Sequence, residues 1–184
     1  MKFIKTKIQD IIIIEPSVFG DNRGYFFESF NLEKFEENVL PVKFVQDNES
    51  KSSKGVLRGL HFQKPPYSQA KLVRCIEGSV LDVAVDIRKG SPTYGKHVAI
   101  ELSGENKKQL FVPRGFAHGF AVLSKTAIFA YKVDNIYAPE YDSGIKYNDK
   151  DLNINWILTE NEVQLSDKDN NLSFFKDLDS PFKF

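Results

Sequence analysis

Ten short runs of strand-forming residues, separated by turn residues, constrain the fold of this chain more than any other feature. The runs are rich in Val, Ile, Phe and Tyr, and Gly, Pro, Asn or Ser interrupts them. They cover residues 10–15, 24–30, 43–47, 55–63, 70–77, 79–88, 96–102, 109–112, 118–123 and 126–134. Turn residues spaced roughly eight to twelve positions apart are typical of a β-sandwich or barrel. The pattern therefore predicts an all-β protein.

One early helix and a mixed tail complete the expected organisation. Asn31 can cap a helix that places Phe35 on its apolar face, and Pro41 follows the helix. After Trp156 we expect short helices or loops. No linker, low-complexity segment or internal repeat interrupts the chain, and 184 residues suffice for a sizeable core. We therefore expect a single domain over residues 1–184.

Charge and cysteine content exclude several classes of partner. Lys plus Arg and Asp plus Glu are equal at 25 each, which argues against broad attraction to nucleic acid or an anionic membrane. An anionic ligand must then be met by locally placed cations. The one cysteine, Cys75, excludes an internal disulfide and fits a reducing compartment. Apolar runs such as residues 11–14 are only strand-sized, and the start MKFIKTKIQD holds no apolar signal region, so we expect a cytoplasmic protein.

The run GVLRGLHFQ, residues 55–63, places Arg58 and His61 in an otherwise apolar strand. A cation beside a side chain that titrates near neutrality suggests a site that holds an anion and moves a proton. The alternative is a core histidine whose ring is simply hydrogen-bonded. A regular strand would point Arg58 and His61 to opposite faces, but Gly59 between them permits a bulge that re-aims one side chain.

The clearest strand pattern is SVLDVAVDIR, residues 79–88. The alternation places Leu81 and Val83 on one face, and Asp82 and Asp86 on the other. On this pattern alone, an ordinary half-exposed strand whose acids meet water is favoured. In a small barrel the second face would instead line a polar interior.

Four further side chains are candidates for chemistry. Lys71 is either an edge lysine or a cavity lysine that stabilises an enolate oxygen. His118, in PRGFAHGF, is either a site residue or a surface-loop histidine. Tyr131 and Tyr137 are either core aromatics or phenols that reach a pocket, where a tyrosine can act as a general acid.

The sequence argues against a metal or a nucleotide cofactor. A metal-binding barrel of this kind usually needs a His-x-His pair, but position 63 is Gln63 and His97 has no partner nearby in sequence. Phosphate loops of the GxGxxG or GxxxxGK type and a GxSxG nucleophile turn are absent. We expect no metal and no cofactor.

Seven segments in order resemble the dTDP-4-dehydrorhamnose 3,5-epimerase family. They are VFGDNRGYFFESF, FVQDNES, GVLRGLHFQ, QAKLVRCIEGSVLDVAVDIRKGSPTYGK, PRGFAHGF, YKVDNIYAPEYDSGI and LSDKD, at residues 18–30, 44–50, 55–63, 69–96, 113–120, 131–145 and 165–169. The resemblance implies a metal-free, cupin-like jelly-roll barrel that forms a homodimer with strand exchange. It also implies conversion of dTDP-4-keto-6-deoxy-D-glucose to dTDP-4-keto-L-rhamnose, a precursor for surface polysaccharides.

The resemblance assigns roles to the candidate residues. It implies that His61 is the base, Asp169 its orienting partner, Lys71 the enolate stabiliser, Tyr131 the acid and Asp82 a supporting carboxylate near the lysine. Arg58 and His118 would contact the diphosphate, and Gln46, Asn48 and Tyr137 the nucleotide. Phe19, Arg23 and Glu28 would reach the nucleotide of the partner protomer. We also predict that His61 and Asp169 hydrogen-bond, although they are 108 positions apart.

Three positions depart from the family pattern. Glu49 stands where His is common, His97 where an aromatic residue is common, and Ile136 where a second Tyr is common. Glu49 adds a negative charge near the nucleotide-binding stretch and leaves the nucleotide preference open. The alternative activities are epimerisation at C3 or C5 only, or ketoisomerisation of a related nucleotide-linked 4-keto sugar.

Overall fold

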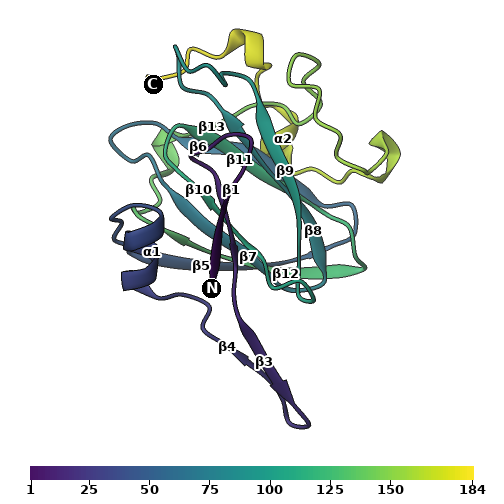
Figure 1. Ribbon diagram of the computed structural model, residues 1–184. Helices are drawn as coiled ribbons and strands as arrows, with labels where there is room; N and C mark the ends of the chain where they lie inside the picture. Colours follow the sequence, from purple (N-terminus) through teal and green to yellow (C-terminus); the bar gives the residue numbers. More distant parts are fainter.

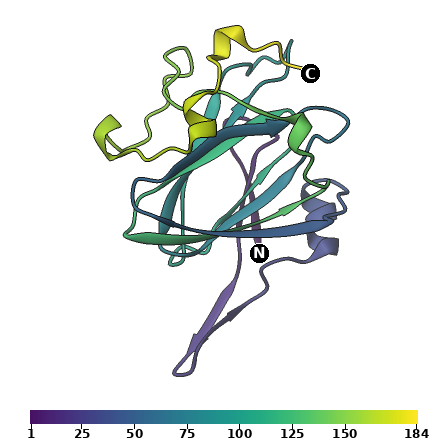
Figure 2. The same cartoon turned by 180° about the vertical axis from the view of Figure 1, so that it is seen from behind.

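Two antiparallel β-sheets face one another in the computed structural model, which describes residues 1–184 (Figures 1 and 2). One sheet has the order β1 (Lys2–Lys5), β2 (Ile12–Glu15), β10 (Gln109–Val112), β7 (Lys71–Glu77), β12 (Thr126–Val133) and β5 (Gln46–Ser53). The other has the order β13 (Asp142–Gly144), β6 (Leu57–Gln63), β11 (Phe116–Val122), β8 (Ser79–Asp86) and β9 (His97–Ser103). The all-β prediction is confirmed.

The main core fills the space between the two sheets. It takes Val73 from β7, Val80 and Ala84 from β8, and Phe120 and Phe129 from the two strands beside them. Because strand side chains alternate, this arrangement turns the whole even-numbered face of β8 toward the interior.

The acids of β8 therefore lie inside the molecule. Asp82 and Asp86 are both 0% exposed, so the expectation that they meet water is wrong. The opposite face of β8, with Leu81 and Val83, is buried as well. It lies in a second core, which holds Trp156 and other residues of the C-terminal segment. Alternation alone could not reveal this second layer, because the segment that covers it lies about 70 positions further along the chain.

Short helices cover the sheets from outside. Helix α1 (Leu32–Asn38) packs Phe35 against the six-stranded sheet, and Asn31 caps it by accepting a 3.0 Å hydrogen bond from the Lys34 amide, as predicted. The tail forms short helices, also as predicted: η2 (Glu160–Glu162), α2 (Asp167–Asn170) and η3 (Phe175–Asp177), with η1 (Pro139–Tyr141) before β13. None of the helices is long and apolar enough to cross a membrane.

Strand β5 begins three residues and ends six residues later than predicted. The sequence pointed to residues 43–47, whereas the strand runs over Gln46–Ser53 and is mostly polar. Its alternate residues Gln46, Asn48 and Ser50 line polar cavities, so the strand lacks the apolar signature of a core strand. Strands β1 and β13 were also missed, because β1 is mostly exposed and β13 has only three residues.

A hairpin of β3 (Val18–Asp21) and β4 (Gly24–Phe27) projects away from both sheets (Figures 1 and 2). The expected strand over residues 24–30 ends at Phe27, and β3 was not predicted. The hairpin carries exposed aromatic side chains, with Phe19 67% and Phe26 71% exposed.

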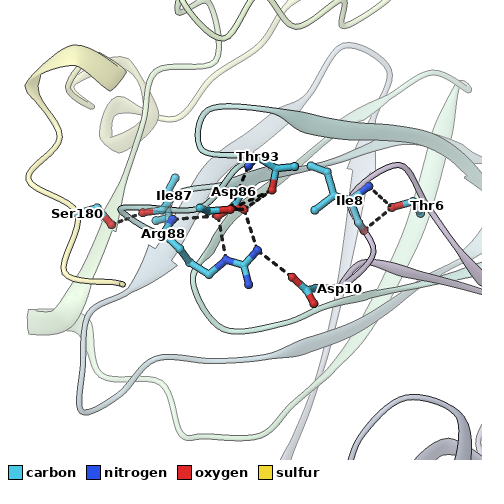
Figure 3. Close-up of polar contacts among 9 residues, drawn as sticks. Thr6, Ile8, Asp10, Asp86, Ile87, Arg88, Thr93 and Ser180 are labelled. Carbon is cyan, nitrogen blue, oxygen red and sulfur yellow. Dashed lines mark hydrogen bonds and ion pairs between the residues drawn. The ribbon is translucent and has the colours of Figure 1, made fainter. Parts of the chain in front are cut away.

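A buried ion pair between Asp86 and Arg88 lies at the end of β8, beside the point where the C-terminal tail is attached (Figure 3). Arg88 Nη2 lies 2.7 Å from Asp86 Oδ2, and Thr93 Oγ1 donates to the same oxygen at 2.6 Å. Burial alone would raise the pKa of Asp86, but hydrogen bonds from Arg88, Ser91 and Thr93 lower it to about 2. Ser180 Oγ donates to the Ile87 carbonyl, which ties the tail to this point.

Candidate active site

A cavity of about 520 Å³ lies between the two sheets and is closed on one side by the C-terminal segment. Six of the predicted catalytic and binding residues line it: Arg58, His61, Lys71, His118, Tyr131 and Asp169. A second cavity of about 280 Å³ adjoins it and shares three of its lining residues, namely His61, Lys71 and Tyr131. One continuous site therefore receives side chains from both sheets.

An irregularity in β6 turns Arg58 and His61 to the same side. Leu57 and Leu60 both belong to the outer core, although a regular strand would separate positions three apart. The phase of the strand changes at Gly59, whose φ of +122° is accessible to glycine, and the register against β11 shifts at this point. Both polar side chains consequently face the cavity, as the bulge interpretation required.

His61 and Asp169 form the hydrogen bond predicted across 108 positions. His61 Nε2 lies 2.5 Å from Asp169 Oδ1, and the carboxylate is only 4% exposed while the ring is 27% exposed. Ser166 Oγ donates to the second oxygen of Asp169 at 2.8 Å. Burial alone would raise the pKa of Asp169, but the hydrogen bond and charge of His61, together with Ser166, hold the pKa below its usual value. The carboxylate thus stays ionised and fixes the ring.

Lys71 points inward from the first position of β7. It shares the interior face with Val73, so it is the cavity lysine of the two alternatives. Burial lowers the pKa of its ammonium to about 8, while the carboxylates of Asp142 and Asp82 act in the opposite direction. At neutral pH the side chain is therefore still mostly protonated, but it loses its proton at a lower pH than an ordinary lysine does.

His118 and Asp82 pair inside the barrel. His118 Nε2 lies 3.0 and 3.1 Å from the two Asp82 oxygens, and the ring is 6% exposed. His118 is thus a strand residue at the cavity wall, so the surface-loop alternative is wrong. The ring also stacks near Phe129, with the two centroids 6.4 Å apart.

Tyr131 enters the cavity from β12, in the sheet opposite His61. Burial raises the pKa of its phenol, Asp142 and Tyr137 raise it further, and Arg58 opposes this shift. The phenol is therefore held in the protonated form that can donate a proton. The guanidinium of Arg58 is steadied by Ser52 Oγ, 3.2 Å from Nη2.

The second cavity gathers the nucleotide-binding candidates Gln46, Asn48 and Tyr137. Gln46 Nε2 donates to Asn48 Oδ1 at 2.8 Å, and Gln46 Oε1 accepts from the Tyr137 amide at 3.3 Å. Tyr137 is 53% exposed, so it is no core aromatic. Gln63 fixes the wall of this second cavity, because its side chain forms hydrogen bonds with the backbones of three loop residues: Tyr67, Ile136 and Ala138.

Three predicted binding residues lie outside both cavities. Phe19 and Arg23 belong to the projecting hairpin, where Arg23 pairs with Asp21 at 2.6 Å. Glu28 pairs with Lys34 at 3.1 Å on the surface. The chain by itself does not bring these side chains to the site.

Sequence reasoning missed several polar residues of the cavity walls. Asp142 and Lys168 form an ion pair, and Lys168 is the neighbour of Asp169 in α2. Ser50 Oγ is the buried side-chain polar atom without a hydrogen-bond partner, and Ser50 lines the larger cavity. Asp142 and Lys168 lie in the segments YDSGI and LSDKD, but charged residues in loop segments give no periodic signal. No three His, Cys, Asp or Glu side chains come together in an arrangement that could hold a metal ion.

Comparison with known proteins assigns the chain to a family. The family model described as dTDP-4-dehydrorhamnose 3,5-epimerase matches residues 5–177. The chain is 59% identical over 180 residues to the Shigella flexneri protein of that name, covering 97% of this chain and 98% of that protein.

Solved structures agree in fold. The dTDP-4-dehydrorhamnose 3,5-epimerase of Elizabethkingia anophelis superposes with a TM-score of 0.92 at 58% identity, covering 96% of this chain and 97% of that one. An epimerase of Legionella pneumophila, solved in complex with dTDP-4-keto-L-rhamnose, gives a TM-score of 0.93 at 51% identity, covering 97% and 94%. Both are cupin-like enzymes of the kind that the sequence segments resemble. With matches of this length and identity, the chain belongs to the dTDP-4-dehydrorhamnose 3,5-epimerase family.

Proposed function

We propose that this protein is an isomerase that inverts C3 and C5 of dTDP-4-keto-6-deoxy-D-glucose and yields dTDP-4-keto-L-rhamnose. The observation that carries the proposal is the short His61–Asp169 hydrogen bond beside the Lys71 ammonium in one cavity. Family membership and the product-bound Legionella relative support the choice of substrate.

The base of the proposed reaction is His61. C3 and C5 both flank the C4 ketone, so one base can remove the proton from either carbon once the enolate is stabilised. Asp169, ionised and buried, orients the ring and stabilises the imidazolium that forms. General acid–base catalysis of this kind is typically worth about 10²- to 10⁴-fold.

Lys71 supplies the charge that the enolate needs. An ammonium fixed beside the C4 oxygen stabilises the negative charge where it develops, and a partly desolvated site strengthens this effect. Its pKa of about 8 keeps it cationic at neutral pH. The Asp82–His118 pair forms the polar wall behind it, and in the proposal His118 shares the diphosphate with Arg58.

Tyr131 returns a proton on the face opposite His61, at least at C5. The two side chains come from opposite sheets, so a sugar ring between them meets the base on one side and the acid on the other. Removal from one face and return on the other inverts the carbon. The raised pKa of the Tyr131 phenol suits a proton donor.

A second copy of the chain completes the proposed nucleotide site. Gln46, Asn48 and Tyr137 hold the nucleotide from within, and the hairpin of one protomer brings Phe19 and Arg23 to its partner. The exposed aromatics on this hairpin support the proposal, because such patches mark interfaces. The unpaired thiol of Cys75 fits the reducing conditions of the cytoplasm.

The test is product analysis by NMR. Purified protein is incubated with dTDP-4-keto-6-deoxy-D-glucose, without added metal or nicotinamide, and the ring couplings are followed. Formation of dTDP-4-keto-L-rhamnose is expected. Inversion at one carbon only would replace the proposal by the mono-epimerase alternative, and an unchanged substrate with folded protein would refute it.

A further inference from the structure

Asp142 lies where three segments of the cavity wall meet. It is the first residue of β13, where it pairs with Gln63 of β6. Tyr137 Oη donates to Asp142 Oδ2 at 3.1 Å, and the Lys168 ammonium forms an ion pair with the same oxygen. The carboxylate is only 10% exposed. One buried oxygen thus joins the Tyr137 loop, the edge strand and helix α2.

Each of these segments carries part of the site. Tyr137 and Asp142 line the smaller cavity, and Lys168 lines the larger one. Lys168 immediately precedes Asp169 in α2, a helix of only four residues. A helix this short has little stability of its own, so side-chain contacts such as the Lys168 ion pair determine where it sits.

We infer that Asp142 is a positioning residue of the active site, which fixes α2 and the Tyr137 loop against the cavity and acts as a counter-charge that keeps Lys71 protonated. This inference rests on the proposed function, because it assigns Lys71 a working charge. Asp142 does not exchange a proton with substrate in this role.

The charges around Lys71 make the inference specific. Asp142 on β13 and Asp82 on β8 face it with negative charge, and Lys168 on α2 with positive charge, while His61 and Tyr131 line the same cavity. Burial lowers the pKa of Lys71 to about 8, Asp142 and Asp82 oppose this, and Lys168 adds to it. Removing Asp142 must therefore lower the pKa of Lys71, and removing Lys168 must raise it.

The two variants Asp142→Asn and Lys168→Gln separate charge from structure. Both break the same ion pair with α2, so a merely structural role predicts effects in the same direction. The counter-charge role predicts that the alkaline limb of kcat/KM moves to lower pH in Asp142→Asn and to higher pH in Lys168→Gln, by up to about one pH unit in each variant. The matched control is Asp179→Asn, which breaks an exposed Lys–Asp pair with Lys89 away from the cavities.

The measurement has a second readout that needs no turnover. The ¹³Cε lysine signals are titrated by NMR in all variants, with Lys71 assigned through its loss in Lys71→Gln. Opposite shifts of the Lys71 midpoint in the two variants, with none in the control, are expected. Shifts of the Lys71 midpoint in the same direction in both variants, or no shift, would overturn the inference. If Asp142→Asn does not fold, a Lys71 midpoint that is unmoved or lowered in Lys168→Gln is enough to overturn it. A protein without epimerase activity would refute the proposed function, while the titration would still decide the role of Asp142.

Discussion

Replacing Lys71 by Met should make the protein more stable and inactive. Folding carries the Lys71 ammonium from water, where its pKa is 10.5, into the cavity, where the pKa is about 8. The folded state therefore disfavours the charged form and is penalised wherever that form dominates in the unfolded chain. Methionine fills similar space without this penalty.

The size of the effect depends on pH in a calculable way. Between pH 8 and 10.5 the unfolded chain binds a proton at Lys71 that the folded protein does not bind, so unfolding takes up a proton. The wild type therefore has no Lys71 penalty above pH 10.5, and it loses stability as the pH falls from 10.5 through 8. The two values give a penalty of at most about 3 kcal/mol at pH 7 and about 1.4 kcal/mol at pH 9.5, since one pKa unit is worth about 1.4 kcal/mol. These are upper limits because Lys71 keeps some contact with solvent.

Urea unfolding of both proteins at pH 7 and pH 9.5 measures the difference. The other titrating groups are present in both proteins, so the comparison isolates the contribution of position 71. We expect Lys71→Met to have a higher unfolding free energy than the wild type at pH 7. The difference between the two unfolding free energies should be smaller by about 1–2 kcal/mol at pH 9.5. A gap that stays constant or widens with pH would refute the account of Lys71 as a buried, destabilised cation.

Three further substitutions test the site framework. Gly59→Ala should cost about 3 kcal/mol of stability, because φ is +122° and the new Cβ would lie 2.6 Å from the Gly119 Cα; a loss below about 1 kcal/mol in urea unfolding would contradict this. Gln63→Met keeps the side-chain volume but removes three hydrogen bonds, so the unfolding free energy should fall by about 3 kcal/mol. KM should rise by a larger factor than kcat falls, and an unchanged KM would refute the role of Gln63 in holding the Tyr137 loop. Asp169→Asn should lower kcat on the order of 100-fold with little change in KM in steady-state kinetics, and a KM effect alone would speak against the dyad.

Most of the strand layout could be predicted because strand periodicity is local. The alternation in residues 79–88 correctly separated the two faces of β8, and the cap at Asn31 correctly located α1. What each face meets is not local information. The sequence pattern favoured solvated acids at Asp82 and Asp86, and only the opposing sheet, which is distant in sequence, accounts for their burial.

The residues of the candidate site likewise fall into those that local sequence patterns indicate and those that only the fold brings together. The positions of Arg58, His61 and Lys71 in apolar strands stood out because packing alone would favour aliphatic residues there. The partnership with Asp169 came from family resemblance, since no pattern in one sequence links positions 108 apart. Asp142 and Lys168 remained hidden because charged residues in loops and short helices are expected to be solvated, and only the fold shows that they meet.

The most direct test of the central claim is position-resolved deuterium exchange in D₂O with dTDP-4-keto-6-deoxy-D-glucose. The account predicts that the wild type places solvent deuterium at C3 and C5 and that His61→Asn places none. Tyr131→Phe should still place deuterium at C5, but without inversion, because the base remains and the acid on the other face is gone. Exchange by His61→Asn at the wild-type rate, or no exchange by the folded wild type at either carbon, would contradict the account.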